Sequence, residues 1–235
     1  ATLAKKIAFT EGLYLEGVCT HLACADSLLE DDIAYTKKQI SNFSYAVEQI
    51  KKEGINPGIL HCSNSGAIFL HPEAHFDMVR PGIVIYGYSS CAKEMGIELK
   101  PVMEFSSQIV AIKHFKKGDS VSYDRTWVAK EDCDIGVIPA GYADGLLRRL
   151  SPGLEVSING KMYPIVGRIC MDQCMVYLGK DYDVKRWDKV IFFGPEKNCN
   201  TAEDLANSIE TISYEILCGV NKRVPRIYVD TDKNK

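Results

Sequence analysis

The sequence has no long hydrophobic run, no surplus of basic charge and only 2 tryptophans among its 235 residues. No apolar stretch approaches the ~18 residues that span a bilayer, so no transmembrane helix is expected. Charged side chains interrupt residues 1–16, which argues against a secretory signal. Lys and Arg number 28 against 31 acidic residues, and the formal charge of −3 gives no reason to expect nucleic acid or an anionic membrane as a partner.

Cysteine, in contrast, is plentiful. The nine cysteines are odd in number and form no dense framework, which favours reduced, buried thiols in a cytoplasmic protein. At 46% hydrophobic and 25% charged residues, the chain has enough apolar material for a sizeable core. Its length suits one large domain or two ordinary ones.

The first 99 residues alternate between strand-like and helix-like segments, which predicts βα units and a parallel sheet or barrel. Strands are expected at 15–21, 58–62 and 76–79, and a short helix at 63–70. Two or three such units are too few for a complete eight-fold barrel of ~250 residues.

A long amphipathic helix is expected between the first two strands. Ile33, Ile40, Phe43 and Val47 recur at helical spacing, and residues 27–30 have the form of a capping box. The sequence therefore predicts one buried and one exposed helix face.

Residues 100–235 consist mainly of short strand-like runs separated by turns, which predicts a mostly antiparallel β-domain. Strand-like runs occupy 102–115, 134–140, 154–158, 162–166, 175–178 and 190–193. Asn159-Gly160 predicts a hairpin turn, because both residues tolerate positive φ. A helix is expected over 201–209 with Thr201 as its cap, and the polar tail 230–235 is expected to fray.

Polar residues follow the predicted parallel strands. His21 follows the first, Asn64 and Ser65 follow the second, and Arg80 and Gly82 follow the third. Ligands bind at the carboxyl ends of such strands, and N–H groups at a helix start suit a phosphate. Each signal is also consistent with a satisfied structural histidine or an ion-paired arginine, so residue chemistry alone leaves both interpretations open.

Other candidate motifs favour structural roles. His71 and His75 have metal-ligand spacing, but Pro72 interrupts the helix that this would need and no third ligand is evident. Cys170 and Cys174 lack the spacing of a zinc knuckle, so no metal is expected.

Six ordered segments of the chain nevertheless resemble alanine racemase. They are THLACAD at 20–26, HCSNS at 61–65, FDMVRPGI at 76–83, GYADG at 141–145, GRICMD at 167–172 and RVPR at 223–226. The resemblance implies an α/β barrel that holds pyridoxal 5'-phosphate, a C-terminal β-domain, and a homodimer with the active site shared across its interface. On this basis, residues 1–99 are expected to be the last βα units of an incomplete (β/α)8 barrel and residues 100–235 the β-domain.

The resemblance also implies roles for individual residues. Tyr123 matches the catalytic tyrosine base, which racemisation needs on one side of the cofactor. His21 would hydrogen-bond that tyrosine and Arg80, and Arg80 would face the pyridine nitrogen as a permanent cation. Four residues match phosphate-binding positions: Ser65, Gly82, Ile83 and Tyr214, with Asn64 beside them. Tyr142 and Met171 match residues of the entrance and the substrate-carboxylate site.

The chain also departs from the family pattern. It opens with Ala1 and contains no segment like Val-x-Lys-Ala-Asn-Ala-Tyr-Gly, where the family's covalent lysine lies. The chain is therefore expected to be truncated and inactive alone. Leu146 stands where an aromatic residue is common, and Asp124 stands where glycine usually follows the tyrosine. A carboxylate there would disfavour ionisation of the phenol if it pointed inward.

The implied activity is the interconversion of L- and D-alanine in the cytoplasm, which supplies D-alanine for peptidoglycan. Two alternatives remain: a racemase of the same architecture with another amino-acid substrate, and a non-catalytic fragment that binds the cofactor or dimerises. Related decarboxylases generally place an acid at the pyridine nitrogen, so Arg80 favours racemisation.

Overall fold

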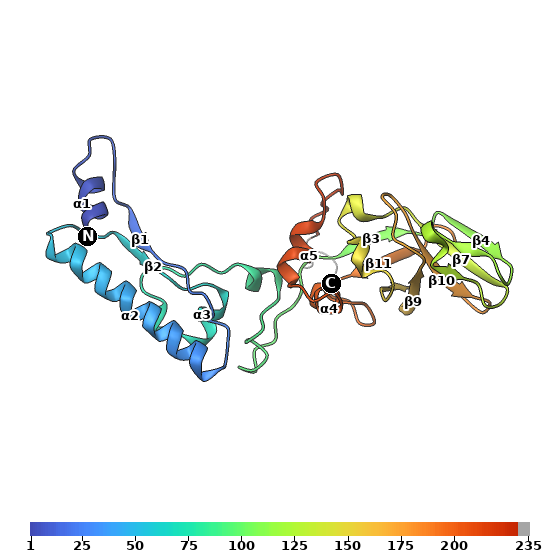
Figure 1. Ribbon diagram of the computed structural model, residues 1–235, viewed down its shortest axis with the longest axis horizontal. Coiled ribbons are helices and arrows are strands. Elements are labelled where there is room, and N and C mark those ends of the chain that lie inside the picture. Colours follow the sequence, from blue (N-terminus) through green and yellow to red (C-terminus); the bar gives the residue numbers. More distant parts are fainter. Residues whose placement is uncertain (230–235) are drawn as a thin grey trace. The chain divides into compact units, whose positions relative to one another are not determined.

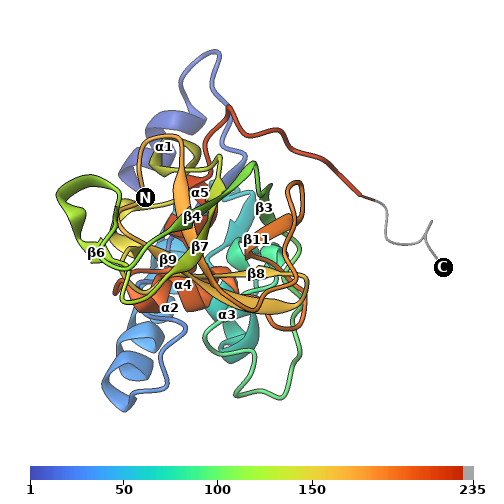
Figure 2. The same ribbon diagram turned by 90° about the vertical axis from the view of Figure 1, so that its right-hand side faces the viewer.

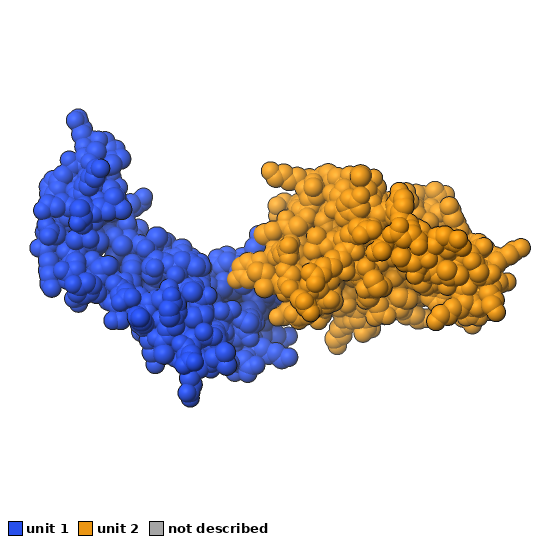
Figure 3. Space-filling view, viewed as in Figure 1, with its two compact units in different colours: residues 1–100 blue, residues 101–235 orange. Residues whose placement is uncertain are grey.

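The computed structural model describes residues 1–229, and the chain divides into two compact units, Ala1–Lys100 and Pro101–Lys235 (Figure 3). The predicted frayed tail at 230–235 lies outside the described residues. Within residues 1–229, no helix is both long enough and apolar enough to cross a membrane.

The first unit pairs two short parallel strands with three α-helices (Figure 1). Its elements are α1 (Thr2–Ala8), β1 (Gly17–Cys19), α2 (Glu30–Lys52), β2 (Ile59–His61), α3 (Ser65–Leu70) and the 3-10 turns η1 (Pro72–Ala74) and η2 (Ile83–Tyr86). The two strands run in parallel, with Cys19 opposite His61. Their carboxyl ends therefore lie side by side.

Helix α2 buries the face that its sequence predicts. Ile40, Phe43 and Val47 are all at least 92% buried and share a core with Leu22 and Cys62. The predicted capping box is wrong, however. The helix begins after Leu29, whose apolar side chain cannot cap it, and the Ser27 hydroxyl donates to Asp32 at 2.5 Å.

The strand expected at 76–79 does not form. Phe76 has a φ of 46°, outside the β region, and forms a turn with Asp77, while Met78 and Val79 belong to no strand. The carboxylate of Asp77 accepts a hydrogen bond from the backbone N–H of Leu60 at 2.8 Å, so a side chain takes the place of a ladder carbonyl. The segment lies beside β2 without joining the sheet as a regular strand.

The second unit is built on a seven-stranded antiparallel sheet (Figures 1 and 2). Its strands are β3 (Phe105–Gln108), β4 (Ala111–Phe115), β7 (Cys133–Ile138), β8 (Glu155–Ile158), β9 (Lys161–Val166), β10 (Cys174–Gly179) and β11 (Lys189–Phe193). They are arranged in the order β3-β11-β8-β9-β10-β7-β4. The antiparallel character expected of this part is therefore present.

Shorter elements complete the second unit. They are the β5–β6 pair (Ser120–Val121 and Trp127–Val128), the 3-10 turns η3 (Tyr123–Arg125), η4 (Tyr142–Asp144) and η5 (Arg148–Leu150), and the helices α4 (Ala202–Ser208) and α5 (Ser213–Gly219). The predicted hairpin joins β8 to β9, with Asn159 and Gly160 at φ values of 51° and 75°. Thr201 caps α4 as its sequence indicates. Helix α5 was not predicted.

Candidate functional site

Arg80 is the centre of a polar cluster at the carboxyl ends of β1 and β2. Its guanidinium donates to the carbonyl oxygen of Thr20 at 2.9 Å. It also lies 2.6 Å from Nδ1 of His61 and 3.4 Å from Nδ1 of His21. The half-buried arginine is thereby held by both strands.

His61 is the member of this cluster that sequence reasoning missed. The register of the two strands identifies it. His61 lies opposite Cys19 on the parallel neighbour, and this places it close to His21, two residues after Cys19. A guanidinium can only donate, so Nδ1 of each imidazole is an acceptor and each neutral ring carries its proton on Nε2. The exposed His21 is thus left with an N–H donor on the side away from Arg80.

Ser65 and Gly82 bring two helix starts together. The backbone N–H of Gly82 donates to Oγ of the buried Ser65 at 2.9 Å, which leaves the serine hydroxyl hydrogen free to donate elsewhere. Ile83 is buried at the first position of η2. In the part of the chain that the structure describes, the backbone N–H groups of Ser65 and Ile83 have no hydrogen-bond partner. This set of uncharged donors has the chemistry of a phosphate site.

Asn64 has a structural role beside these donors. Its side-chain oxygen caps α3 by accepting from the N–H of Ala67 at 3.2 Å, and its amide donates to the carbonyl oxygen of Leu22 at 3.0 Å. Both bonds fix the start of α3 against the segment that follows β1.

In the second unit, Tyr142 and Met171 lie on two segments that pair through their backbones. The N–H of Tyr142 donates to Cys170 and the N–H of Ala143 donates to Met171, both at 3.0 Å. A Cβ on Gly141 would collide with the carbonyl oxygens of Cys170 and Met171, so only glycine permits this approach. Both the Tyr142 and the Met171 side chains are exposed.

Arg223 ties the same two segments to the chain after α5. Its guanidinium donates to Asp144 and to Asp172, each at 2.7 Å. These two hydrogen bonds raise the pKa of Arg223 above its ordinary value, so the bridging group is permanently charged. The order of the motifs at 141–145, 167–172 and 223–226 did not predict that they meet in the structure.

Tyr123 projects from η3 with 70% of its surface exposed. The residues on either side of it are both bonded to Arg168. Ser122 donates to the Arg168 carbonyl oxygen at 2.8 Å, and Asp124 accepts from the Arg168 guanidinium at 2.9 Å. The Asp124 carboxylate is therefore paired with a guanidinium. Asp124 has a φ of 62°, a left-handed conformation that glycine adopts without strain.

Tyr214 is the second residue of α5, and its side chain is about half exposed. The end of this helix packs closely on η4, because a Cβ on Gly145 would lie 2.6 Å from Cα of Val220. The structure thus links α5 with the Tyr142 and Met171 segments inside the second unit, while His21, Asn64, Ser65, Arg80, Gly82 and Ile83 belong to the first.

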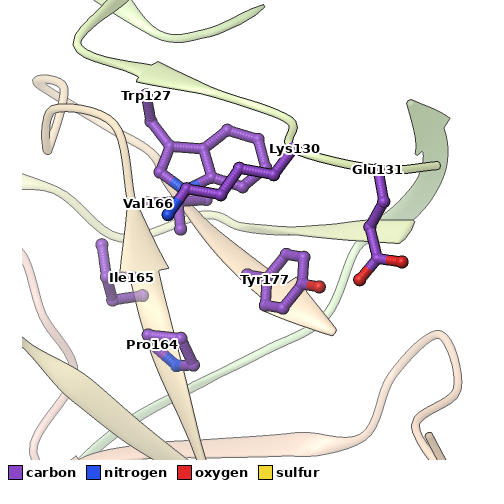
Figure 4. A pocket seen from close by; sticks show the side chains of 7 residues that line it. All are labelled: Trp127, Lys130, Glu131, Pro164, Ile165, Val166 and Tyr177. Atoms are coloured by element: carbon purple, nitrogen blue, oxygen red, sulfur yellow. The ribbon is translucent and has the colours of Figure 1, made fainter. Parts of the chain in front are cut away.

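A separate hollow of about 400 Å³ lies between β6, β9 and β10 (Figure 4). Trp127 and Tyr177, with ring centroids 5.8 Å apart, form its aromatic wall, and Lys130 and Glu131 stand at its edge. No residue that the sequence assigns to the site lines this hollow.

His71 and His75 contact different neighbours in the structure. His71 lies 3.2 Å from Glu73, and His75 lies 3.1 Å from the carbonyl oxygen of Ile68. Among residues 1–229, no group of three or more His, Cys, Asp or Glu side chains is placed to hold a metal ion. All nine cysteines are free, but the expectation that they are buried is wrong for five of them, since only Cys62, Cys91, Cys133 and Cys174 are buried. Burial raises the pKa of Cys174 far above its ordinary value.

Comparison with known proteins shows similarity over both units. The family descriptions "Alanine racemase, N-terminal domain" and "Alanine racemase, C-terminal domain" match residues 1–90 and 102–228. The chain is 53% identical to an alanine racemase of Treponema denticola over 234 residues, which are 97% of this chain and 61% of that protein. It is 46% identical to an alanine racemase of Treponema pallidum, covering 97% and 62% of the two chains.

Solved structures show the same similarity. The structure of an alanine racemase of Clostridium difficile in complex with cycloserine matches with a TM-score of 0.89 at 37% identity, over 97% of this chain and 61% of that one. An alanine racemase of Bacillus anthracis with bound L-Ala-P matches with a TM-score of 0.89 at 35% identity, over 97% and 58%. The chain thus spans about three fifths of the length of these proteins.

Proposed function

The chain belongs to the alanine racemase family, and we propose that it serves the interconversion of L- and D-alanine with pyridoxal phosphate as cofactor. The observation that carries this proposal is the Arg80 cluster. The Arg80 guanidinium is a permanent cation that Thr20 and His61 hold at the carboxyl ends of two parallel strands, with His21 beside it. An acid at that position would suit a decarboxylase instead.

The residues of the first unit fit the proposed cofactor. Ser65, Gly82 and Ile83 would form its phosphate site, since the serine hydroxyl and the N–H of Ile83 are donors without a partner among the described residues and the N–H of Gly82 holds the serine oxygen. By resemblance, Tyr214 is a further candidate for the phosphate, and Asn64 would fix the start of α3. When bound, pyridoxal phosphate supplies an electron sink that stabilises the charge left at the α-carbon after its proton is removed.

The chain's own residues would supply the acid–base and binding groups. In a two-base mechanism, Tyr123 would take the α-proton from one enantiomer at its phenolic oxygen, or deliver a proton to that face in the reverse direction, while a second base serves the opposite face; the Nε2–H of His21 would orient the phenolic oxygen. Arg80 would donate to the pyridine nitrogen and, because a guanidinium keeps its protons, would leave that nitrogen unprotonated. Tyr142 and Met171 would border the substrate entrance and the carboxylate site.

Further parts of the proposal concern assembly and location. The first unit would belong to the cofactor barrel, and Tyr123 would act on the cofactor held by a second copy in a homodimer. We assign no lysine of this chain to the cofactor, and propose that the 235 residues alone do not racemise alanine. Nine free thiols suit the cytoplasm, where D-alanine would be made for peptidoglycan.

A grafted enzyme tests the proposal. In it, these 235 residues replace the matching residues of the Treponema denticola alanine racemase, to which they are 53% identical. We expect this grafted enzyme to interconvert the two alanine enantiomers, measured by chiral chromatography and by α-proton exchange in heavy water. Tyr123→Phe should abolish proton abstraction from one enantiomer more than from the other.

Other outcomes would decide against it. A grafted enzyme that folds and binds pyridoxal phosphate without racemising any amino acid would identify the chain as a non-catalytic cofactor-binding or dimerisation module. Racemisation of another amino acid but not of alanine would reassign the substrate. Proton exchange by the 235-residue chain alone, above that of free cofactor, would show that one of its own lysines binds the cofactor.

A further inference from the structure

The segment that carries Tyr123 is conformationally unfavourable by itself. Ser122, Asp124 and Arg125 have φ values of 67°, 62° and 49°, although none of them is glycine. The left-handed region costs energy for side chains with a Cβ, so a run of such residues persists only where the surrounding structure determines it. Contacts outside the segment must therefore hold Tyr123 in place.

Two of those contacts come from Arg168, beside a 3.5 Å contact between Ser122 and Cys170 and a hydrogen bond from Arg125 to Ser120. Arg168 accepts a hydrogen bond from Ser122 through its carbonyl oxygen at 2.8 Å and donates from Nε to Asp124 at 2.9 Å. It thus binds the residue before Tyr123 and the residue after it. The Tyr123 side chain remains 70% exposed between these two anchors.

The backbone at Gly167, just before Arg168, packs closely against Ser122. Gly167 has a φ of 67°, and a Cβ there would lie 2.7 Å from the Cβ of Ser122. Arg168 therefore starts from a backbone already packed on the η3 segment, and its side chain is only 34% exposed. An ion pair on such a preorganised arginine loses less side-chain entropy than a freely exposed pair.

We propose that Asp124 and Arg168 are positioning residues that together hold the Tyr123 loop in its catalytic orientation. This inference rests on the proposed function only in taking Tyr123 as the base. Where the family pattern has glycine, the left-handed conformation has no strain and needs no such partner. Here an aspartate occupies the position, and its bond to Arg168 offsets the conformational cost.

The first test is hydrogen exchange of the full 235-residue chain, which needs neither cofactor nor activity. Asp124→Asn keeps the shape and the tolerance of positive φ but removes the charge. We expect amide exchange within residues 122–126 to become about five-fold faster, the factor that an effective surface ion pair supplies. Arg168→Met should have the same effect, and the double variant should add little to either single one.

Glu210→Gln is the matched control. Glu210 is also acidic, also has a positive φ of 57°, and faces Arg149 at 3.9 Å. Its replacement should leave exchange in residues 122–126 unchanged. Equal exchange in Asp124→Asn and Glu210→Gln, or additive effects of Asp124→Asn and Arg168→Met, would overturn the inference.

The second test uses the grafted enzyme and separates positioning from general stability. Asp124→Asn should lower kcat several-fold while KM for alanine changes less than about two-fold, because the base is misplaced but the substrate contacts remain. Asp124→Glu, which keeps the charge, should restore part of the loss. A rise in KM with unchanged kcat would contradict a positioning role. If the grafted enzyme fails to racemise at all, the proposed function fails, and the exchange experiment still decides whether the pair holds the loop.

Discussion

The guanidinium of Arg223 donates a hydrogen bond to the carboxylate of Asp144 at 2.7 Å, although the two residues are 79 positions apart in the sequence. The same guanidinium bonds Asp172 at 2.7 Å through its other end. Asp144 in turn accepts from the backbone N–H of Gly141 at 2.8 Å. One arginine therefore connects the segments on which Tyr142 and Met171 lie.

Replacing Arg223 by lysine should loosen both segments. The planar guanidinium reaches two carboxylates with two different nitrogens, whereas an ammonium is a single point charge. We expect Arg223→Lys to lower the melting temperature by a few degrees and to speed amide exchange in residues 141–145 and 167–172. Arg149→Lys is the control, since Arg149 makes only a 3.9 Å contact with an exposed glutamate. Equal effects of the two variants would contradict the bridging role.

Gly145 is expected to tolerate no side chain. Its φ is 108°, and a Cβ would lie 2.6 Å from Cα of Val220 and against the carbonyl oxygen of Gly219. Gly145→Ala should lower the free energy of unfolding by about 2–5 kcal/mol, from backbone strain and overpacking together. Gly118→Ala shares the positive φ, at 95°, but its Cβ meets nothing within 4 Å. It should cost only about 1–2 kcal/mol in urea unfolding.

The Tyr182–Asp134 hydrogen bond should make stability depend on pH at both ends. The Tyr182 hydroxyl donates to Asp134 at 2.6 Å, which lowers the pKa of that carboxyl, with His114 as a second donor. A depressed folded pKa gives stability that is present above the unfolded value of about 3.9 and is lost as pH falls below it. The same bond raises the pKa of Tyr182 to about 12, so its contribution is lost as pH rises from about 10 toward that value.

Tyr182→Phe should therefore flatten both limbs of the stability profile, measured by urea unfolding from about pH 2 to about pH 12. Tyr163→Phe removes a hydroxyl that makes no hydrogen bond in the described part of the chain and should leave the profile as it is. Parallel profiles for the parent chain and Tyr182→Phe would refute the assignment.

Ser65→Ala should weaken binding of pyridoxal phosphate. The change removes one hydroxyl donor from the proposed phosphate site, and a hydrogen bond to a charged group of about 1.5 kcal/mol corresponds to roughly a ten-fold higher Kd. Cofactor fluorescence of the grafted enzyme measures it. Ser63→Ala is the matched control, because Ser63 donates to the carbonyl oxygen of Ala74 at 2.8 Å, and its loss should affect stability rather than affinity. Unchanged affinity in Ser65→Ala would remove Ser65 from the site.

Local pattern predicted much of the fold. The spacing of Ile40, Phe43 and Val47 predicted the buried face of α2, and Asn159-Gly160 predicted the β8–β9 turn, because these features depend on residues a few positions apart. The capping box at 27–30 and the strand at 76–79 were wrong. In both places a side-chain carboxylate, Asp32 or Asp77, takes a hydrogen bond that the expected local structure would have used differently.

For the candidate site, the sequence predicted individual residues but not all of the contacts between them. Arg80 and His21 could be named from their positions after predicted strands, and the ordered motifs identified Tyr123, Tyr142 and Met171 by resemblance. The bond from Arg80 to His61 could not be named without the register of β1 on β2. The pairing of Asp124 with Arg168 required the approach of two segments 44 positions apart.

The sequence by itself determined the amphipathic helix α2, the turns and the antiparallel strands of the second unit, since each follows from residue types at short spacing. It also determined the family, which follows from motifs in a fixed order. Only the tertiary structure decided which charges meet. The Arg223 and Arg168 contacts depend on how strands and loops pack at long range, and glycines such as Gly141 and Gly145 permit that packing where a Cβ would collide with backbone atoms. Long-range pairing is set by the summed packing of many residues, and no local pattern encodes it.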